Sequence, residues 1–75
     1  MKEKIIEILE TLHPGVDYEN EDSLIDSRVL DSFDVVSLVG ELMDEFDVRI
    51  LAEHMIPENF NSADAIVRLV ESLEE

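Results

Sequence analysis

Cysteine is absent from the 75-residue sequence, and glycine and proline occur only twice each. Without cysteine the protein has no disulfide and no thiolate that could act as a nucleophile or a soft metal ligand. Two glycines are too few for a glycine-rich loop that holds phosphates. No apolar run approaches a membrane span, and Glu3, Glu7 and Glu10 interrupt what would otherwise be a secretory signal. We therefore expect one cytoplasmic domain, residues 1–75, without membrane insertion.

Basic residues are also scarce: five stand against 20 acidic residues, which gives a net charge of −15. Nucleic acids and anionic membranes would be repelled by this charge, so neither is an expected partner. Basic protein surfaces are the expected partners. Because 45% of the residues are hydrophobic and recur with helical spacing, the acidity indicates a folded domain rather than a disordered one. We expect this domain to be a monomer.

Helical periodicity is present in three segments, residues 3–12, 32–46 and 63–73. The first ends before Pro14, which disfavours helical geometry at the preceding residue. The second begins after Asp31, a good N-cap that Asp34 can complement in a capping box. Ser62 is the expected N-cap of the third segment. The caps and stops therefore predict three main helices.

A long polar connection, residues 14–30, links the first two helices and is predicted to contain a short helical turn near residues 23–26. Its apolar residues are expected to hold it against the helices: Val16, Tyr18, Leu24, Ile25, Val29 and Leu30. A short helix is expected within residues 52–60, broken or started at Pro57. The predicted fold is all-α: a small antiparallel helical bundle of three main helices plus one short helix, with a long loop between the first two.

The polar residues offer few conventional sites. His13 and His54 are interpreted as surface histidines, and the sequence contains neither a GxSxG nor an HExxH motif. The alternate acidic residues that begin at Asp17 resemble the start of an EF-hand loop. However, Asp22 stands where that loop needs glycine, and Arg28 stands where it needs glutamate. No metal site is therefore predicted, although loose divalent binding stays possible.

The motif Asp31-Ser32-Phe33 lies where the long loop meets the second helix. At this point the sequence resembles the acyl carrier protein superfamily, which has Asp-Ser-Leu or a close variant at the start of its second helix. The resemblance continues along the second helix and resumes at residues 62–66, so it covers essentially the whole chain. It implies that Ser32 carries a covalent 4′-phosphopantetheine arm derived from coenzyme A. Asp31 and Phe33 would flank the arm.

The resemblance also implies a function and a set of partners. The chain would be an acyl or aminoacyl carrier protein and not an enzyme. Its partners would be a phosphopantetheinyl transferase, an acyl- or aminoacyl-activating ligase or adenylation enzyme, and downstream acyl-transferring enzymes. Partner docking is predicted along the second helix, at Asp34, Val35, Val39, Glu41, Asp44 and Glu45. Charged residues on such a surface mainly steer association.

Two alternatives stay open at this stage. Ser32 could simply be a helix cap, although Asp31 already provides one. The protein would then be an acidic helical interaction module without a prosthetic group. The cargo is also open between fatty acyl, D-alanyl, amino acid and polyketide groups. Phe33 and residues 57–62 look most like D-alanyl and stand-alone peptidyl carriers, whereas Ser37 and Gly40 depart from the fatty-acid pattern. Close approach of another backbone is one explanation for Gly40.

Overall fold

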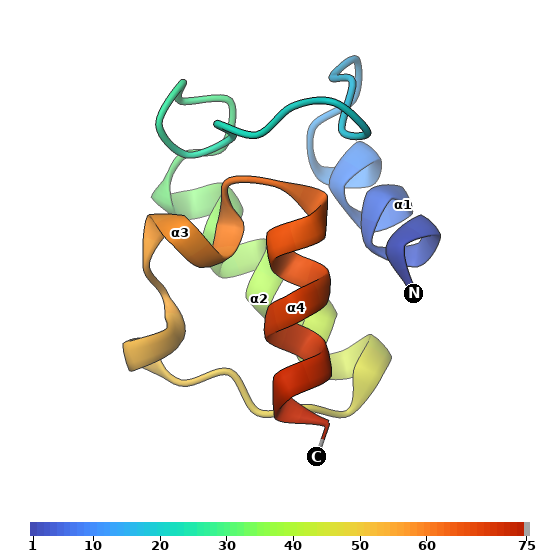
Figure 1. Ribbon diagram of the computed structural model, residues 1–75, viewed down its shortest axis with the longest axis vertical. Helices are drawn as coiled ribbons and strands as arrows, with labels where there is room; N and C mark the ends of the chain where they lie inside the picture. The colour runs from blue at the N-terminus through green and yellow to red at the C-terminus, as the bar shows by residue number, and fades with distance from the viewer. Residues whose placement is uncertain (75) are drawn as a thin grey trace.

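The three periodic segments form helices with nearly the predicted bounds in a computed structural model, which describes residues 1–74. Helix α1 spans Lys2–Leu12, α2 spans Ser32–Phe46 and α4 spans Ala63–Leu73. In Figure 1 the chain runs up along α1 and down along α2 and α4, so α1 is antiparallel to both. Helix α1 packs against α2 and α4. No strand occurs within residues 1–74, and the predicted all-α bundle is confirmed.

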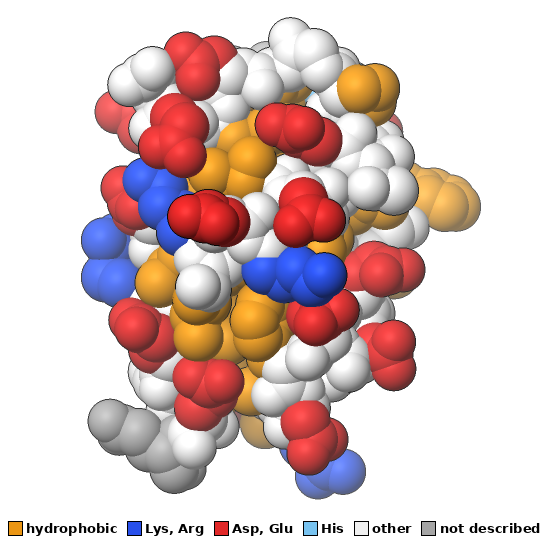
Figure 2. All heavy atoms as spheres, turned by 90° about the vertical axis from the view of Figure 1, so that its right-hand side faces the viewer, with side chains coloured by type: hydrophobic (Ala, Val, Ile, Leu, Met, Phe, Trp, Pro, Cys, Tyr) orange, Lys and Arg blue, Asp and Glu red, His pale blue; other side chains and the backbone are white. Residues whose placement is uncertain are grey.

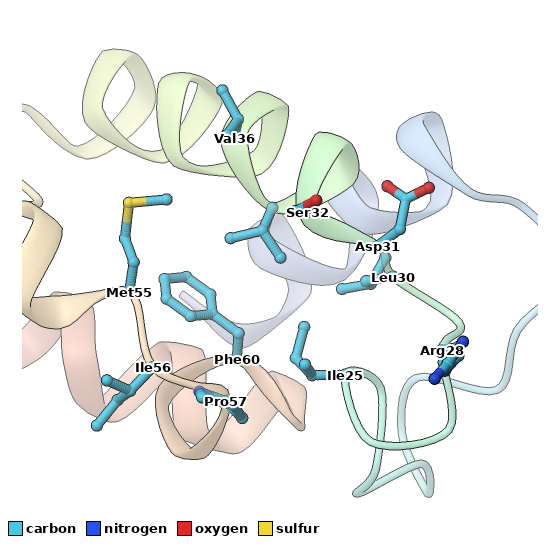
Figure 3. Close-up of a pocket in the computed structure, with 11 residues that line it drawn as sticks. Ile25, Arg28, Leu30, Asp31, Ser32, Val36, Met55, Ile56, Pro57 and Phe60 are labelled. Carbon is cyan, nitrogen blue, oxygen red and sulfur yellow. The ribbon is translucent and has the colours of Figure 1, made fainter.

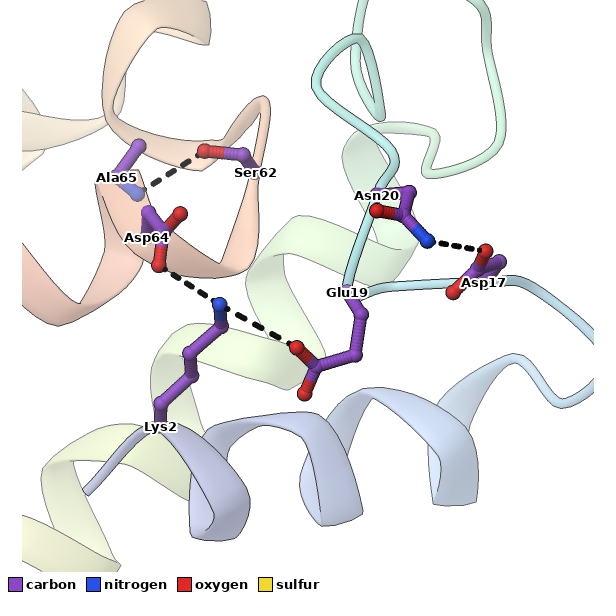
Figure 4. Close-up of polar contacts among 7 residues, drawn as sticks. All are labelled: Lys2, Asp17, Glu19, Asn20, Ser62, Asp64 and Ala65. Carbon is purple, nitrogen blue, oxygen red and sulfur yellow. Dashed lines mark hydrogen bonds and ion pairs between the residues drawn. The ribbon is translucent and has the colours of Figure 1, made fainter.

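The predicted caps of α2 and α4 are both formed. The Asp31 carboxylate accepts a hydrogen bond from the Asp34 backbone N–H at 2.9 Å, and the Asp34 carboxylate accepts one from the Asp31 N–H at 3.3 Å. The Ser62 hydroxyl accepts a hydrogen bond from the Ala65 N–H at 3.0 Å (Figure 4). These bonds satisfy N–H groups that the first turn of a helix leaves without partners. Local capping chemistry therefore determines where both helices begin.

The long loop between α1 and α2 is held down by buried apolar side chains, as predicted. Tyr18, Leu24 and Leu30 are each at most 2% exposed. The Tyr18 hydroxyl donates its proton to the His13 carbonyl at the end of α1 and lies 3.3 Å from the Leu9 carbonyl. The predicted helical turn is present and is closed by a hydrogen bond from residue 27 to residue 23. The loop is therefore an ordered layer over the ends of the helices.

The segment between α2 and α4 contains two short helical pieces where one was predicted. A 3₁₀ turn, η1, spans Ala52–His54, and a short helix, α3, spans Pro57–Phe60 with Pro57 at its first position. The His54 ring accepts a hydrogen bond from the Leu51 N–H at 3.0 Å through Nδ1. His54 therefore stabilises the start of η1 and is not simply a surface histidine. Helix α3 packs against α4.

An ion-pair bridge links three separate segments of the chain (Figure 4). The Lys2 ammonium lies 3.0 Å from Asp64 at the start of α4 and 3.5 Å from Glu19 in the long loop. The hydrogen bond to Asp64 and the nearby negative charges raise the pKa of Lys2. Because the groups are exposed, this bridge orients the segments more than it stabilises the fold.

Acidic side chains are spread over the face shown in Figure 2, with only a few basic groups between them. Asp17, Glu19 and Glu21, which suggested a calcium loop, instead interact with Asn20, Lys2 and the Ser23 N–H. Among residues 1–74, no three His, Asp or Glu side chains are placed to share a metal ion. Within the same range, no helix combines the length and the apolar character that a membrane span requires.

Candidate functional site

Ser32 is the first residue of α2, and its side chain is exposed. The capping box at this helix start is formed by Asp31 and Asp34. Within residues 1–74 the Ser32 hydroxyl makes no hydrogen bond of its own, and the capping box is closed by Asp31 and Asp34 without it. Ser32 is therefore available for chemistry without loss of the cap.

A groove with a volume of about 460 Å³ lies beside Ser32 (Figure 3). Ile25 and Leu30 of the long loop form one wall of it. The first turns of α2 form a second wall, and the segment around α3 forms the third. These two walls contribute the remaining apolar lining: Val35, Val36, Met55, Ile56, Pro57 and Phe60. Arg28 and Asp31 are the charged residues among the lining. The groove would therefore favour an apolar group that is attached at, or presented beside, Ser32.

The structure corrects the choice of valines for a partner-facing surface. Val39 is only 6% exposed and belongs to the core, so it cannot offer an exposed docking surface. Val35 is half-buried in the wall of the groove. Val36 is 61% exposed and Phe33 is 81% exposed. The apolar stripe of α2 was too wide for its period alone to tell which valine points outward, because four valines and leucines occur in close succession.

The acidic residues predicted for docking, Asp34, Glu41, Asp44 and Glu45, are not part of the lining of the groove. Glu41 and Glu45 line a different hollow, on the flank of α2 that faces α1, and Glu45 lies 3.9 Å from the Lys4 ammonium. Asp34 is held in the capping box. Asp44 is exposed, and at 100° per residue it shares its side of the helix with Phe33. Asp44 therefore lies on the exposed apolar side of α2, whereas Glu41 and Glu45 lie on the adjoining flank.

Gly40 is exposed on the same outer face of α2. A Cβ atom at this position would meet no other atom within 4 Å. The suggestion that another backbone approaches Gly40 closely is therefore wrong. The packing of the described residues gives no reason for a glycine here.

The groove contains apolar residues that the motif analysis did not include. Met55 and Ile56 are 37% and 44% exposed and lie across the groove from α2 (Figure 3). Their signal in the sequence is an apolar pair directly before Pro57, in a segment too short for a core helix. Asn61, which ties this segment to the loop before Ser32, gave no signal because its partners lie about 35 residues away in the chain.

A small helical bundle with a long first loop and an exposed serine at the start of its second helix has the organisation of a carrier protein. No family model matches the chain. The D-alanyl carrier protein of Streptococcus sanguinis is 35% identical over 74 residues, which cover 97% of this chain and 94% of that protein. The D-alanyl carrier protein of Lactococcus lactis subsp. cremoris is 35% identical over 74 residues, which cover 95% of this chain and 92% of that protein.

The D-alanyl carrier protein of Streptococcus thermophilus is 34% identical, with 97% of this chain and 94% of that protein covered. The chain therefore belongs to the acyl carrier protein family, of which these D-alanyl carrier proteins are members. Its role is that of a carrier protein. A carrier protein is not itself an enzyme; it carries substrates for other enzymes.

Proposed function

We propose that Ser32 is the covalent attachment site of a 4′-phosphopantetheine arm and that the carried group is D-alanyl. The observation that supports this most directly is the exposed Ser32 hydroxyl, which the helix cap does not use, at the edge of an apolar groove. When bound, 4′-phosphopantetheine supplies a terminal thiol that holds the carried group as a thioester. The D-alanyl assignment rests on the names of the relatives.

Attachment requires Ser32 to act as a nucleophile within a phosphopantetheinyl transferase. Its Oγ would form a phosphodiester bond with the pantetheine-bearing phosphorus of coenzyme A, while the bond to the departing 3′,5′-ADP breaks. The hydroxyl proton would pass to a base of the transferase, because the carboxylate of the preceding residue, Asp31, is bound to the Asp34 N–H. We place this reaction in the cytoplasm, where coenzyme A is available.

The start of α2 suits the phosphodiester that this reaction produces. The Asp34 N–H bonds the Asp31 carboxylate, and the Val35 N–H bonds the Asp31 carbonyl at 3.0 Å. Within the described residues, the N–H groups of Ser32 and Phe33 make no hydrogen bond inside the protein. They are therefore available as donors at the positive end of a 15-residue helix. The attraction of these two N–H groups for the phosphodiester counters its repulsion by the Asp31 and Asp34 carboxylates, which are both bound to backbone N–H groups in the cap.

The lining of the groove bears on the cargo. A D-alanyl group carries an ammonium, and an ammonium is costly to bury without a charged partner. The lining of the groove is mostly apolar, and its acidic residue, Asp31, accepts the Asp34 N–H in the helix cap. The groove therefore suits the apolar part of the arm, while the D-alanyl group stays at the surface, where partner enzymes can reach it.

The outer face of α2 is proposed as the docking surface for the transferase and for a D-alanine-activating ligase. The exposed apolar residues Phe33 and Val36 would contact these partners, while Asp44 on the same face and Glu41 on the adjoining flank would attract basic groups on them. Val35 lies in the wall of the groove instead of on this surface, and Asp34 and Glu45 flank the surface on the other side. Asp34 is better left unchanged in tests, because its replacement would also break the capping box.

Charge reversal tests this docking surface. Glu41→Lys with Asp44→Lys should slow the modification of Ser32 several-fold at low salt, and the difference should shrink at high salt as screening removes the steering. The matched control is Glu71→Lys with Glu74→Lys, which makes the same charge change on exposed positions outside α2. Equal losses from both pairs would show that net charge, and not the face of α2, governs recognition.

The function itself is tested in two steps by intact-protein mass spectrometry. In the first step, incubation with coenzyme A and a broad-specificity phosphopantetheinyl transferase should add one phosphopantetheine to the wild type and none to a folded Ser32→Ala variant. In the second step, the modified protein is offered D-alanine, L-alanine or a fatty acid with the corresponding activating ligase and ATP. Loading with D-alanine is expected.

Each step has a result that would contradict the proposal. No addition to the wild type in the first step would favour the alternative, an acidic interaction module without a prosthetic group. A modified protein that accepts only fatty acids in the second step would overturn the D-alanyl assignment and leave the attachment site intact.

A further inference from the structure

Asn61 binds three consecutive residues of the long loop, although it lies about 35 residues further along the chain. Its backbone carbonyl accepts a hydrogen bond from the Leu24 N–H at 2.8 Å. Its side-chain Oδ1 accepts from the N–H groups of Ile25 at 2.9 Å and Asp26 at 3.2 Å. Its Nδ2 donates to the Asp26 carboxylate at 3.2 Å. We call these four contacts the Asn61 clamp.

The clamp connects directly to the residues before Ser32. Leu24, whose N–H is held by Asn61, accepts a hydrogen bond at its own carbonyl from the Leu30 N–H at 2.9 Å. Both leucines are at most 1% exposed, so this part of the loop is fixed in the core as well. Leu30 immediately precedes Asp31, the cap of α2. A continuous path of backbone hydrogen bonds therefore leads from Asn61 to the residue before the cap.

The clamp also joins two walls of the groove. Ile25 and Leu30 line it from the loop, whereas Phe60, the neighbour of Asn61 in the sequence, lines it from α3 (Figure 3). Within residues 1–74, no hydrogen bond other than those of the clamp joins residues 23–31 to residues 55–62. The separation of these two walls therefore depends on Asn61 and on apolar contacts, which have no fixed direction.

We propose that Asn61 is a positioning residue for the carrier site. It holds the loop before Ser32 and the α3 wall in the arrangement that partner enzymes recognise. This inference rests on the proposed function, because Ser32 modification is one of its readouts. A single residue can do this because a hydrogen bond fixes direction as well as distance, and a small misplacement at a reacting group can cost a large part of the rate.

The first test compares two neighbouring substitutions. Asn61→Ala removes the side-chain bonds of the clamp, whereas Ser62→Ala removes the N-cap of α4 and leaves the clamp intact. Both variants should stay folded with a lowered melting temperature. Asn61→Ala should lower the kcat/KM of Ser32 modification by roughly three- to ten-fold. Ser62→Ala should leave kcat/KM within about two-fold of the wild type, as expected of a change that affects only stability. Equal losses in the two variants would overturn the proposal.

The second test is a rescue by exchange of donor and acceptor. Asn61→Asp alone places a carboxylate against the Asp26 carboxylate, and it should slow modification at least as much as Asn61→Ala. Asn61→Asp combined with Asp26→Asn restores the pair with reversed roles: the new amide at position 26 donates to the new carboxylate at position 61. The double variant should regain most of the wild-type rate. A double variant as slow as Asn61→Asp would contradict the clamp.

A third readout does not require modification at all. In amide hydrogen exchange, the N–H groups of Ile25 and Asp26, which lose their acceptor, should exchange faster in Asn61→Ala than in Ser62→Ala. If the wild type is never modified but this difference is found, the proposed function fails and the clamp stands. If the wild type is modified and the two variants exchange alike, the clamp fails and the proposed function stands.

Discussion

Asp31 and Ser32 are neighbours at the start of α2, but the structure gives them different tasks, and their alanine variants should separate these tasks. Asp31→Ala removes the carboxylate that accepts the Asp34 N–H at 2.9 Å, so this N–H loses its partner in the protein. Loss of an Asp cap costs about 1 kcal/mol of unfolding free energy. For a domain of this size, this corresponds to a fall of about 4–8 °C in the melting temperature.

Ser32→Ala should behave differently. The Ser32 hydroxyl makes no hydrogen bond within the described residues, its side chain is exposed, and alanine has the higher helix propensity. The change in unfolding free energy should be within about 0.5 kcal/mol, of either sign. Thermal unfolding followed by circular dichroism at neutral pH measures both variants. A Ser32→Ala variant destabilised as much as Asp31→Ala would show that Ser32 is a structural cap, and the reasoning for its chemical role would fail.

Three further predictions concern stability. Gly40→Ala should stabilise the protein by about 0.5–1 kcal/mol in urea unfolding, because a Cβ atom there meets no other atom and alanine favours the helix. Gly15→Ala should destabilise it, because residue 15 has a φ of +89°. A Gly40→Ala variant that is less stable than the wild type would contradict the open space at this position. Burial raises the pKa of Tyr18 above its ordinary value of 10.0, and the charges of Asp34 and Glu10 raise it further. The contribution of Tyr18 to the unfolding free energy is therefore complete below pH 10.0, and it is lost as the pH rises through the pKa of the folded state. Tyr18→Phe should therefore be about 1 kcal/mol less stable at neutral pH but lose less stability on alkaline titration; parallel titration curves would contradict this. Finally, added salt or millimolar magnesium should raise the melting temperature, because screening weakens the self-repulsion of a net charge of −15 more than it weakens the few ion pairs. A melting temperature that does not change would show that the charges are too dispersed to matter.

Features that depend on local chemistry could be predicted from the sequence. The caps at Asp31 and Ser62 lie next to the helices they begin, and the stop before Pro14 follows from the geometry of the proline ring. Helix bounds were therefore nearly correct. The buried residues of the long loop could also be predicted, because apolar side chains in a polar segment have few reasons to be there other than packing.

Features that depend on contacts distant in sequence could not be predicted. Whether Val36 or Val39 points outward depends on where α1 and α4 pack, and the stripe on α2 is too wide to decide it. The groove forms only when the loop and the α3 segment meet at α2. The Asn61 clamp joins residues about 35 positions apart, and no periodicity or motif indicates such a pair.

The most direct test of the central claim is to locate the modification by peptide mass spectrometry after reaction with coenzyme A and a phosphopantetheinyl transferase. The chain contains other serines on its surface, including Ser27, which serve as internal controls. The account predicts that phosphopantetheine is found on the peptide with Ser32, at the Ser32 side chain and nowhere else. Modification of another serine, or an unmodified Ser32 in a folded protein, would contradict it.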